Sequence, residues 1–503
     1  MGALSGAYDG ASTRRRSLKE WVTGAGSADA DTLWDLPTLR ERSRDLVRNS
    51  TIASGAINKV TTSVIGSGLK LRAEVDNEAL GISKEQAKAF EADAERLWKL
   101  WSESVECDAA RTLTFAEMQD VVFRSALESG DCFALLPMFS RLGSPFGLKV
   151  QLIEADRVSN PDGKADSNTL AGGIAKDKRG APTSIHIQET HPGDINPKVR
   201  KWKQVPMFGS RTGRKNVIHI TRKLRPGQTR GVPYLAPIIE SIKQISRYTE
   251  AEIMAAVVSG MFTVAITTDT GDNILSPFES DGTQETESPE DYKLGNGAMI
   301  GLAKGESVET INPGRPNAQF DPFVQAILVQ VGMALEIPYE VLINHFGQSF
   351  SAAQASLLEA WRFFITRREH QASIFNQPIY DSFIGEQVAA GRLSAPGFFA
   401  NPLVRKAYTG AKWVGRPKGS IREDIAVKAA VLRLDNNLST HAQETLEASG
   451  NDWDRDEAQR LHETKTMQER KEILAPVMDG GESDKNSDSR DKDSKDGGDN
   501  EAT

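Results

Sequence analysis

Cysteine and histidine are the residues of this chain with the widest chemical repertoire, and their spacing indicates no site. Cys107 and Cys132 stand far apart and lack the paired spacing of zinc ligands. His186 and His191 flank a predicted strand end without an HExxH pattern, which favours ordinary surface or core side chains over metal ligands. We therefore predict no metal site. Two thiols in so long a chain indicate a reducing compartment.

Sequence motifs for phosphate, dinucleotide and acyl chemistry are missing too. No GxxxxGK(S/T) loop occurs, and no GxGxxG follows a predicted strand. The run Gly347-Gln348-Ser349-Phe350-Ser351 fails as a nucleophile elbow at its last position. We predict no catalytic residue, no cofactor and no enzyme. A nucleic-acid-processing enzyme stays as the less favoured alternative, because sites can assemble from distant residues.

Acidic side chains gather in one polar, turn-rich stretch between Asp269 and Asp291. Carboxylates at this density could bind a divalent cation. Its glycines and glutamates are not placed as the glycine and the terminal glutamate of a calcium-binding loop are, so a solvated connection is the favoured interpretation.

The net charge of the chain is −8, and much of it lies in the C-terminal tail. The segment 479–503 has nine acidic and four basic residues and so carries −5. A protein that grips DNA through its phosphates shows a basic surface instead, so this chain is not built to hold DNA tightly. The basic run Arg14-Arg15-Arg16 lies in an arm rich in Gly, Ala and Ser, where a solvated tail is favoured over nucleic-acid binding.

Membrane insertion and secretion are not indicated. The longest apolar run, Met254 to Ile266, is interrupted by polar or small residues and is shorter than the ~20 residues of a membrane span. Met1 to Gly10 lacks the apolar core of a signal peptide. We predict no membrane partner.

The N-terminal half of the chain predicts helices followed by strands. Leu36–Val64 has a helical pattern, and Ser83-Lys84-Glu85-Gln86 fits a capping box that opens another helix. Thr114 precedes a third helix. Strand-like runs lie between Asp131 and Ile220, separated by Gly, Pro, Asn and Asp. The pattern predicts an α+β fold with a small mixed or antiparallel sheet.

A long helix is predicted from Leu235 to Met261, where isoleucines recur at three- and four-residue steps. At ~40 Å it requires neighbours along its length, either within the chain or from copies of itself. Further helices are predicted from Pro322 to Glu336, from a capping box at Ser351 to Phe375, and from Ser420 to Leu434. The tail after Asp479 has a disordered composition.

A set of motifs stands in a fixed order along the chain. The most specific, Arg225-Pro226-Gly227-Gln228-Thr229-Arg230-Gly231-Val232-Pro233, lies between a predicted strand and the long helix. The others are Leu46-Val47-Arg48-Asn49, Val64-Ile65-Gly66-Ser67-Gly68, Thr190-His191-Pro192-Gly193-Asp194, Leu335-Glu336-Ile337-Pro338-Tyr339-Glu340 and Ser449-Gly450-Asn451-Asp452-Trp453. Together they resemble the lambda-type portal protein family of tailed bacteriophages, over about residues 36–475.

The resemblance implies a ring of identical subunits, usually a dodecamer, at one vertex of the capsid, through which double-stranded DNA is packaged and ejected. The implied partners are other copies of the chain, the large terminase subunit, the major capsid and scaffold proteins, the head–tail connector or tail proteins, and DNA. The implied location is the virion, with the host cytoplasm during assembly. Another phage head assembly protein is the alternative, although scaffolds and tape measures are mostly simple helical rods.

The family architecture implies a portal-type fold with several regions. Residues 1–35 would be a flexible arm, 36–234 a wing of helices and a small sheet, 235–262 a stem helix, and 263–315 a clip. Residues 316–337 would be a second stem helix, 338–352 a channel-loop region, 353–415 further wing helices, 416–478 a helical crown, and 479–503 a disordered acidic tail.

The first group of candidate site residues would face the channel and its DNA: Lys243, Arg247, Asn344, His345 and Gln348. For the two basic residues the alternative is salt bridges between neighbouring stem helices. For the loop around Asn344 the alternative is a plain surface connection.

The second group lies in the turn that leads from the sheet into the long helix: Arg225, Gln228, Arg230 and Gly231. A turn at this place joins two regions, so we expect these residues to hold wing to stem, or subunit to subunit, rather than to grip DNA.

Overall fold

The computed structural model describes residues 8–13, 15–195, 200–261, 265–268, 306–309, 319–345, 349–419 and 422–478. The chain forms two compact units, Met1–Gly415 and Arg416–Thr503. Among the described residues, no helix is long and apolar enough to cross a membrane.

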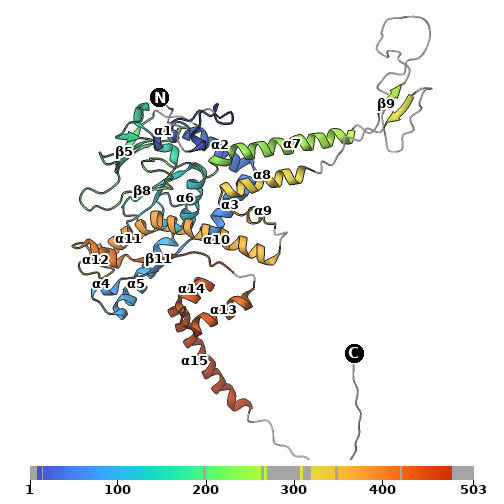
Figure 1. The fold of residues 1–503 in the computed structure, drawn as a ribbon. Helices are drawn as coiled ribbons and strands as arrows, with labels where there is room; N and C mark the ends of the chain where they lie inside the picture. The colour runs from blue at the N-terminus through green and yellow to red at the C-terminus, as the bar shows by residue number, and fades with distance from the viewer. Residues whose placement is uncertain are drawn as a thin grey trace, which may run out of the picture. The chain divides into compact units, whose positions relative to one another are not determined.

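Helices and antiparallel strands together build the first unit, which confirms the predicted α+β class (Figure 1). One sheet has the strand order β3-β2-β8, and another has the order β4-β5-β6-β7. All of their pairings are antiparallel. The strands are β2 Asp131–Leu135, β3 Gln151–Ile153, β4 Leu170–Ala171, β5 Ile174–Lys176, β6 Pro182–Gln188, β7 Trp202–Pro206 and β8 Val217–Thr221.

The register of the first sheet decides which polar groups meet. Asp131 at the start of β2 lies opposite Thr221 at the end of β8, and Phe133 lies opposite His219. Side chains of a strand alternate between its two faces, so Asp131, Phe133 and His219 share one face of this sheet.

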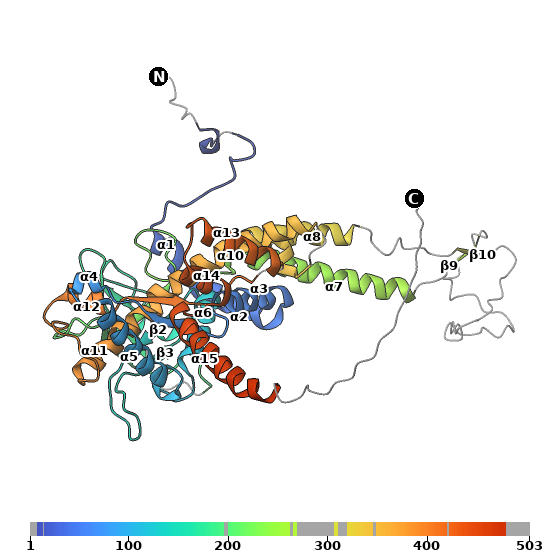
Figure 2. The same ribbon diagram turned by 90° about the horizontal axis from the view of Figure 1, so that it is seen from below.

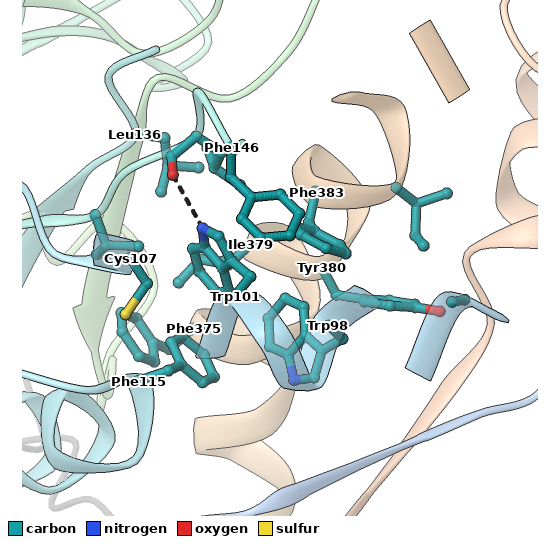
Figure 3. Close-up of a cluster of buried hydrophobic side chains, with 14 of the residues drawn as sticks. Trp98, Trp101, Cys107, Phe115, Leu136, Phe146, Phe375, Ile379, Tyr380 and Phe383 are labelled. Carbon is teal, nitrogen blue, oxygen red and sulfur yellow. Dashed lines mark hydrogen bonds between the residues drawn. The ribbon is translucent and has the colours of Figure 1, made fainter. Parts of the chain in front are cut away.

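The larger aromatic core joins helices that are far apart in the sequence (Figure 3). Trp98 and Trp101 come from α5 (Lys84–Ser102), Phe115 begins α6 (Phe115–Ser129), and Phe383 lies in α11 (Gln377–Ala389). The ring centroid of Trp98 lies 5.1 Å from that of Phe115 and 5.2 Å from that of Phe383, both edge-on. Such pairs add about 0.5–1.5 kcal/mol each beyond burial, so this core fixes α11 against the N-terminal helices.

Capping boxes begin α5 and α6. The backbone N–H of Gln86 donates to Ser83 Oγ, and the backbone N–H of Ser83 donates to Gln86 Oε1, which confirms the predicted box. Thr114 and Glu117 make the same reciprocal bonds. Each box satisfies two donors at the helix start.

The first 170 residues also hold several short helices and 3₁₀ turns. They are η1 Asp9–Ala11, α1 Ala28–Leu33, α4 Asn77–Leu80, η2 Val105–Cys107, η3 Ala155–Arg157 and η4 Pro161–Gly163.

The pattern over Leu36–Val64 predicted one continuous helix. This prediction is wrong, because the segment forms two helices. They are α2 (Leu36–Asn49) and α3 (Thr51–Val64). Ser50 between them is extended, with φ −107° and ψ 123°, and its Oγ accepts from the N–H of Ala53. A serine that ends one helix also caps the next, which hydrophobic periodicity alone does not reveal.

A strand also lies in the region 353–415, which was expected to hold helices. β11 (Ala411–Val414) pairs with β1 (Lys70–Ala73) in antiparallel register, with Lys70 opposite Val414. The short helix α12 (Pro402–Tyr408) precedes it. Neither strand has a local partner, so the pairing is visible only once the chain has folded back.

The helices predicted from Leu235 and from Pro322 are present, and they lie side by side in both views (Figures 1 and 2). The 3₁₀ turn η5 (Ala236–Ile238) leads into α7 (Ile239–Met261), and its partner is α8 (Phe320–Ala334). Tyr248 of α7 packs on Phe320 and Phe323 of α8, with ring centroids 5.4 and 5.1 Å apart. We call α7 and α8 the helix pair.

The capping box predicted at Ser351 is wrong. Ser349 is the N-cap of α10 (Phe350–Gln371), with its Oγ accepting from the N–H of Ala352, so Ser351 lies inside the helix. The helix also does not end at Phe375, because a π-helical turn (Ala372–Asn376) leads directly into α11. Before α10 lies the short helix α9 (Tyr339–Ile343).

The second unit consists of α13 (Glu423–Asp435), α14 (His441–Ser449) and α15 (Trp453–Met478). Ser420, the predicted cap, lies outside the described residues, and Arg422 occupies the N-cap without a side-chain cap bond. Among residues 422–471, whose side chains are described, none is fully buried. These helices therefore share no closed core of their own.

Two expected segments fall outside the described residues. These are the acidic stretch 269–291 and the tail 479–503. Within the region expected to be the clip, β9 (Ala265–Thr268) and β10 (Glu306–Glu309) pair antiparallel, with Glu306 opposite Thr268.

Candidate functional site

The joint, residues 225–231, leads from β8 towards the helix pair, and Arg230 is its buried centre. The Arg230 Nε and Nη2 groups donate to the two carboxylate oxygens of Asp131 at 2.6 and 3.0 Å. The remaining N–H groups donate to the carbonyl oxygens of Val158, Gly172 and Ala155, each at 2.7 Å. A guanidinium has five N–H donors, and here all five bond within the chain. Arg230 is therefore not available to DNA.

Asp131 receives hydrogen bonds from four sides, although it is completely buried. Besides Arg230, the donors are Arg40 Nη2 at 2.8 Å, His219 Nε2 at 3.0 Å and the backbone N–H of Gly231 at 3.2 Å. Burial alone would raise the pKa of Asp131. The positive charges of Arg230 and Arg40 and the bond from His219 outweigh it and keep the pKa well below its usual value.

The other members of this buried network come from separate elements. Arg40 lies on α2 and also reaches Asp156 at 3.4 Å, and burial lowers its pKa to about 10. His219 on β8 stacks on Phe133, with ring centroids 4.3 Å apart, and burial lowers its pKa. The network thereby ties α2, β2 and β8 to the joint. Breaking such a buried ion pair leaves an uncompensated charge.

Gly231 stands where the joint passes close to the start of β2. A Cβ built on it would lie 1.9 Å from the carbonyl oxygen of Gly130 and 2.5 Å from Thr221 Oγ1. Gly130 itself has φ +86° and caps α6. Both glycines are required because two backbones meet here with no room for a side chain.

Two further joint residues are Gln228, which is buried, and Arg225, which is exposed. The buried amide of Gln228 accepts from the N–H groups of Leu224 and Arg225 at 2.8 and 3.2 Å and donates to the Arg230 carbonyl at 2.8 Å. Arg225 is exposed and pairs with Asp31 of α1 at 2.6 Å. Asp29 of the same helix accepts from the N–H of Thr229 at 2.7 Å. Segment 26–31 thus contacts the joint through acidic side chains.

The candidate channel residues of the helix pair are Lys243 and Arg247, both exposed on α7. Within the described part of the chain, neither forms an ion pair. They lie one turn apart and so share one side of the helix.

The candidate loop residues after α9 are only partly described. Asn344 ends α9 with φ +55°, and its side-chain oxygen accepts from Lys59 Nζ. His345 is exposed, with its backbone N–H bonded to the Glu340 carbonyl at 3.1 Å. Gln348 lies outside the described residues. The structure brings Asn344 to α3 and not to Lys243 or Arg247 of the helix pair.

The thiols are structural. Cys107 and Cys132 are free and buried, and burial raises the pKa of both to about 12. A thiol that stays protonated at neutral pH is a poor nucleophile.

One cluster was not foreseen from the sequence: Glu154, Asp156 and His191 offer ligand atoms that lie within 4.8 Å of one another. Asp156 already pairs with Arg44 and Arg40, and Glu154 lies 3.3 Å from Arg44. These arginines supply the positive charge that a cation would bring. The cluster therefore continues the buried network around Asp131.

These features define a protein whose polar interior fixes its own fold and whose helix pair presents exposed charged and apolar side chains. Residues 14–368 match the family model described as phage portal protein, lambda family. Portal protein B of Escherichia phage lambda is 25% identical over 496 residues, covering 94% of this chain and 91% of that protein. The portal protein of Escherichia phage N15 is 25% identical over 470 residues, covering 89% and 87%.

Solved structures give a weaker likeness. A virion of a native gene transfer agent particle matches with TM-score 0.40 and 12% identity, covering 82% of this chain and 92% of that chain. An HK97 family phage portal protein from Corynebacterium diphtheriae matches with TM-score 0.26 and 13% identity, covering 63% and 84%.

The chain belongs to the lambda family of phage portal proteins. Its predicted portal-type fold and its predicted function are thereby confirmed: it is a portal protein of a tailed phage, with the general portal roles in genome packaging and in docking at the head.

Proposed function

We propose that this portal protein closes into a ring of identical copies, usually twelve, and that double-stranded DNA passes through the ring without being gripped. The observation that carries the proposal is the helix pair. Beyond Ile245, no described side chain of α7 is fully buried. A helix of this length needs neighbours to cover it, and other copies of the chain supply them.

The charge of the chain supports a passive conduit. Double-stranded DNA carries about one negative charge per 1.7 Å of axis, and a channel lined with many cations would hold it in place. The helix pair offers only Lys243 and Arg247 as exposed cations on the described part of α7. Few cationic positions allow DNA to slide.

The joint is proposed to transmit load between the sheets and the helix pair. Arg230, Gln228 and Gly231 bond within the chain, which favours a wing-to-stem role over contact with another copy. Arg225 lies at the surface and bonds to the N-terminal segment.

The proposed partners in assembly are the large terminase subunit, the capsid and scaffold proteins and the connector or tail proteins, in the host cytoplasm and then in the virion. No catalytic turnover is proposed. Purified chain incubated with ATP and DNA should release no more phosphate than a mock purification does, and turnover above that level would contradict a passive role.

Electron micrographs of the purified protein test the ring directly. Closed rings with a central hole are expected. A chain that stays monomeric or dimeric under assembly conditions would overturn the proposal.

The roles of Lys243 and Arg247 are tested by neutralising both, as K243Q/R247Q, with the exposed K99Q on α5 as a matched control. If they face DNA, rings form normally and the rate of DNA packaging in vitro changes several-fold, because the phosphates then pass a channel without these two cations. If they pair with neighbouring copies instead, ring formation itself falls, and the channel assignment is wrong. The control should change neither.

A further inference from the structure

Two hollows lie against the helix pair. The first has a volume of about 590 Å³ and lies between α8 and α10, with Val329, Met333 and Phe363 among its lining residues. The second has a volume of about 350 Å³ and lies between α7 and the α2–α3 junction, with Ile52 and Ile253 among its lining residues. Both have apolar lining beside exposed apolar side chains.

Helical geometry places these hollows on opposite sides of the pair. An α-helix turns by about 100° per residue. On α7, Tyr248 faces α8, while Ile253 of the second hollow lies about 140° round the helix from it. On α8, Phe320 faces α7, while Val329 of the first hollow lies about 180° away. The order is therefore second hollow, α7, α8, first hollow.

Large apolar side chains are exposed at both hollows. Met333 is 77% exposed at the first, and Ile253 is 59% exposed at the second. Exposed apolar groups gathered at a concave surface mark a contact site. A two-fold axis repeats each contact of residue i with residue j as j with i inside one shared patch. The two groups lie on opposite sides of the pair, so one two-fold interface cannot hold both. They can meet head to tail between successive copies, which is the contact that closes rings.

The charged rims are compatible with this arrangement. At the first hollow, the Arg362 side chain is 79% exposed, and its one ion pair with a described residue is the exposed pair with Glu359, a kind worth little in water. At the second hollow, Glu250 is exposed, and it has no ion pair with a described residue. The first rim also carries the acidic Glu336 and Glu359, whereas Glu250 is the charged lining residue of the second, so Arg362 of one rim can face an opposite charge on the other.

We infer that the first hollow of one copy covers the second hollow of the next, so that Met333 packs on Ile253 and Arg362 lies near Glu250 of the neighbouring copy. This inference rests on the proposed ring and specifies which faces build it. The occupant of each hollow is a second copy of this chain.

Disulfide trapping tests the contact. The full-length double variant M333C/I253C is assembled, oxidised and run on a non-reducing gel. The two natural thiols are buried and protonated, so they give no background. A head-to-tail contact gives a ladder of covalent oligomers that ends at the number of subunits in the ring. Each single variant gives no ladder, because residues 333 and 253 never meet their own counterparts.

The control pair is M333C/L142C, since Leu142 is fully exposed on a hairpin loop away from both hollows. It should give no ladder. Rings in the micrographs without a ladder from M333C/I253C would overturn this inference and leave the ring intact. Absence of rings in the unmodified chain would overturn the proposed function as well.

A charge exchange covers the case in which the cysteine variants fail to fold. Glu250→Arg alone and Arg362→Glu alone place like charges together and should each reduce ring yield several-fold. The double variant restores opposite charges and should recover most of the yield. Lack of recovery, with folded monomers by circular dichroism, would also count against the contact.

Discussion

The buried network around Asp131 and the helix pair handle polar and apolar groups in opposite ways. In the network, a completely buried carboxylate meets two guanidinium groups, an imidazole and a backbone N–H, all from the same chain. On the helix pair, side chains as apolar as Met333 and Ile253 face solvent. The polar groups of the network find their partners when one chain folds, whereas the exposed apolar side chains of the helix pair are covered only when copies meet.

The difference separates two kinds of mutational damage. Changes in the network should lower the free energy of unfolding of a single chain. Changes on the outer sides of the helix pair should leave that free energy nearly unchanged and alter assembly instead. The predictions below are ordered by the size of their expected effect on chain stability.

Replacing Arg230 by Met should have the largest effect. It leaves Asp131 buried with one guanidinium fewer and removes the Arg230 hydrogen bonds to three backbone carbonyl oxygens, so the free energy of unfolding should fall by about 3–5 kcal/mol. Guanidinium chloride unfolding followed by tryptophan fluorescence measures it. R225M is the control, since that side chain is exposed, and it should cost less than about 1 kcal/mol. Equal losses in both variants would contradict the central place of Arg230.

Replacing Gly231 by Ala should cost about 1–3 kcal/mol or more, because the new Cβ would overlap the Gly130 carbonyl oxygen. Gly55 offers a matched control, since it lies inside α3 with nothing within 4 Å of its would-be Cβ. G55A should stabilise the chain by about 0.5–1 kcal/mol. The same unfolding curve reports both, with shifts of opposite sign.

Stability should fall on acidification in two ranges. The folded-state pKa of His219 is lowered, so the unfolded chain takes up a proton below pH ~6.5 that the folded chain does not, and stability falls as the pH drops from there. The pKa of Asp131 is also lowered, so its stabilisation is complete above pH ~4 and is lost as the pH falls further. His370, whose pKa burial lowers, adds to the first range.

The variant H219Q isolates one contribution. It should show a shallower loss of unfolding free energy between pH ~6.5 and ~5 than the unmodified chain, by up to about 1.4 kcal/mol per pH unit. The loss at lower pH should remain. Identical pH profiles would show that His219 titrates normally in the folded state.

Replacing Ile253 by Ser should have the smallest effect on one chain, within about 0.5 kcal/mol, because the side chain is mostly exposed. Its effect should appear in ring yield by size-exclusion chromatography. A substantial loss of chain stability would mean that α7 is supported within the chain, and the contrast between the two regions would weaken.

Much of the scaffold follows from local sequence. Repeated isoleucines predicted α7, a Ser–Gln pair predicted the cap of α5, and the motif from Arg225 to Pro233 identified the joint. These features depend on residues close together, where periodicity and capping chemistry act. The sequence predicted Ser351 as the cap of α10, whereas Ser349 is the cap in the structure. Both serines can start a helix, and the path of the preceding chain decides which one does.

The partner of Arg230 could not be found from the motif, because Asp131 lies far away in the sequence. A signal existed nonetheless. Asp131 opens an otherwise apolar strand, and a carboxylate at such a place requires a buried cation. The sequence also could not predict that the exposed sides of α7 and α8 point in opposite directions. The side of a helix that stays exposed depends on which neighbouring element covers its other side.

Helix α15 adds a thermal consequence. Every described side chain from Ala458 to Lys471 is exposed, so this stretch has only its own hydrogen bonds and neighbouring side-chain pairs to keep it helical. A helix without tertiary support melts gradually as water warms. The far-ultraviolet circular dichroism of the unassembled chain should therefore lose ellipticity steadily on heating, well before the sheets unfold in a cooperative step.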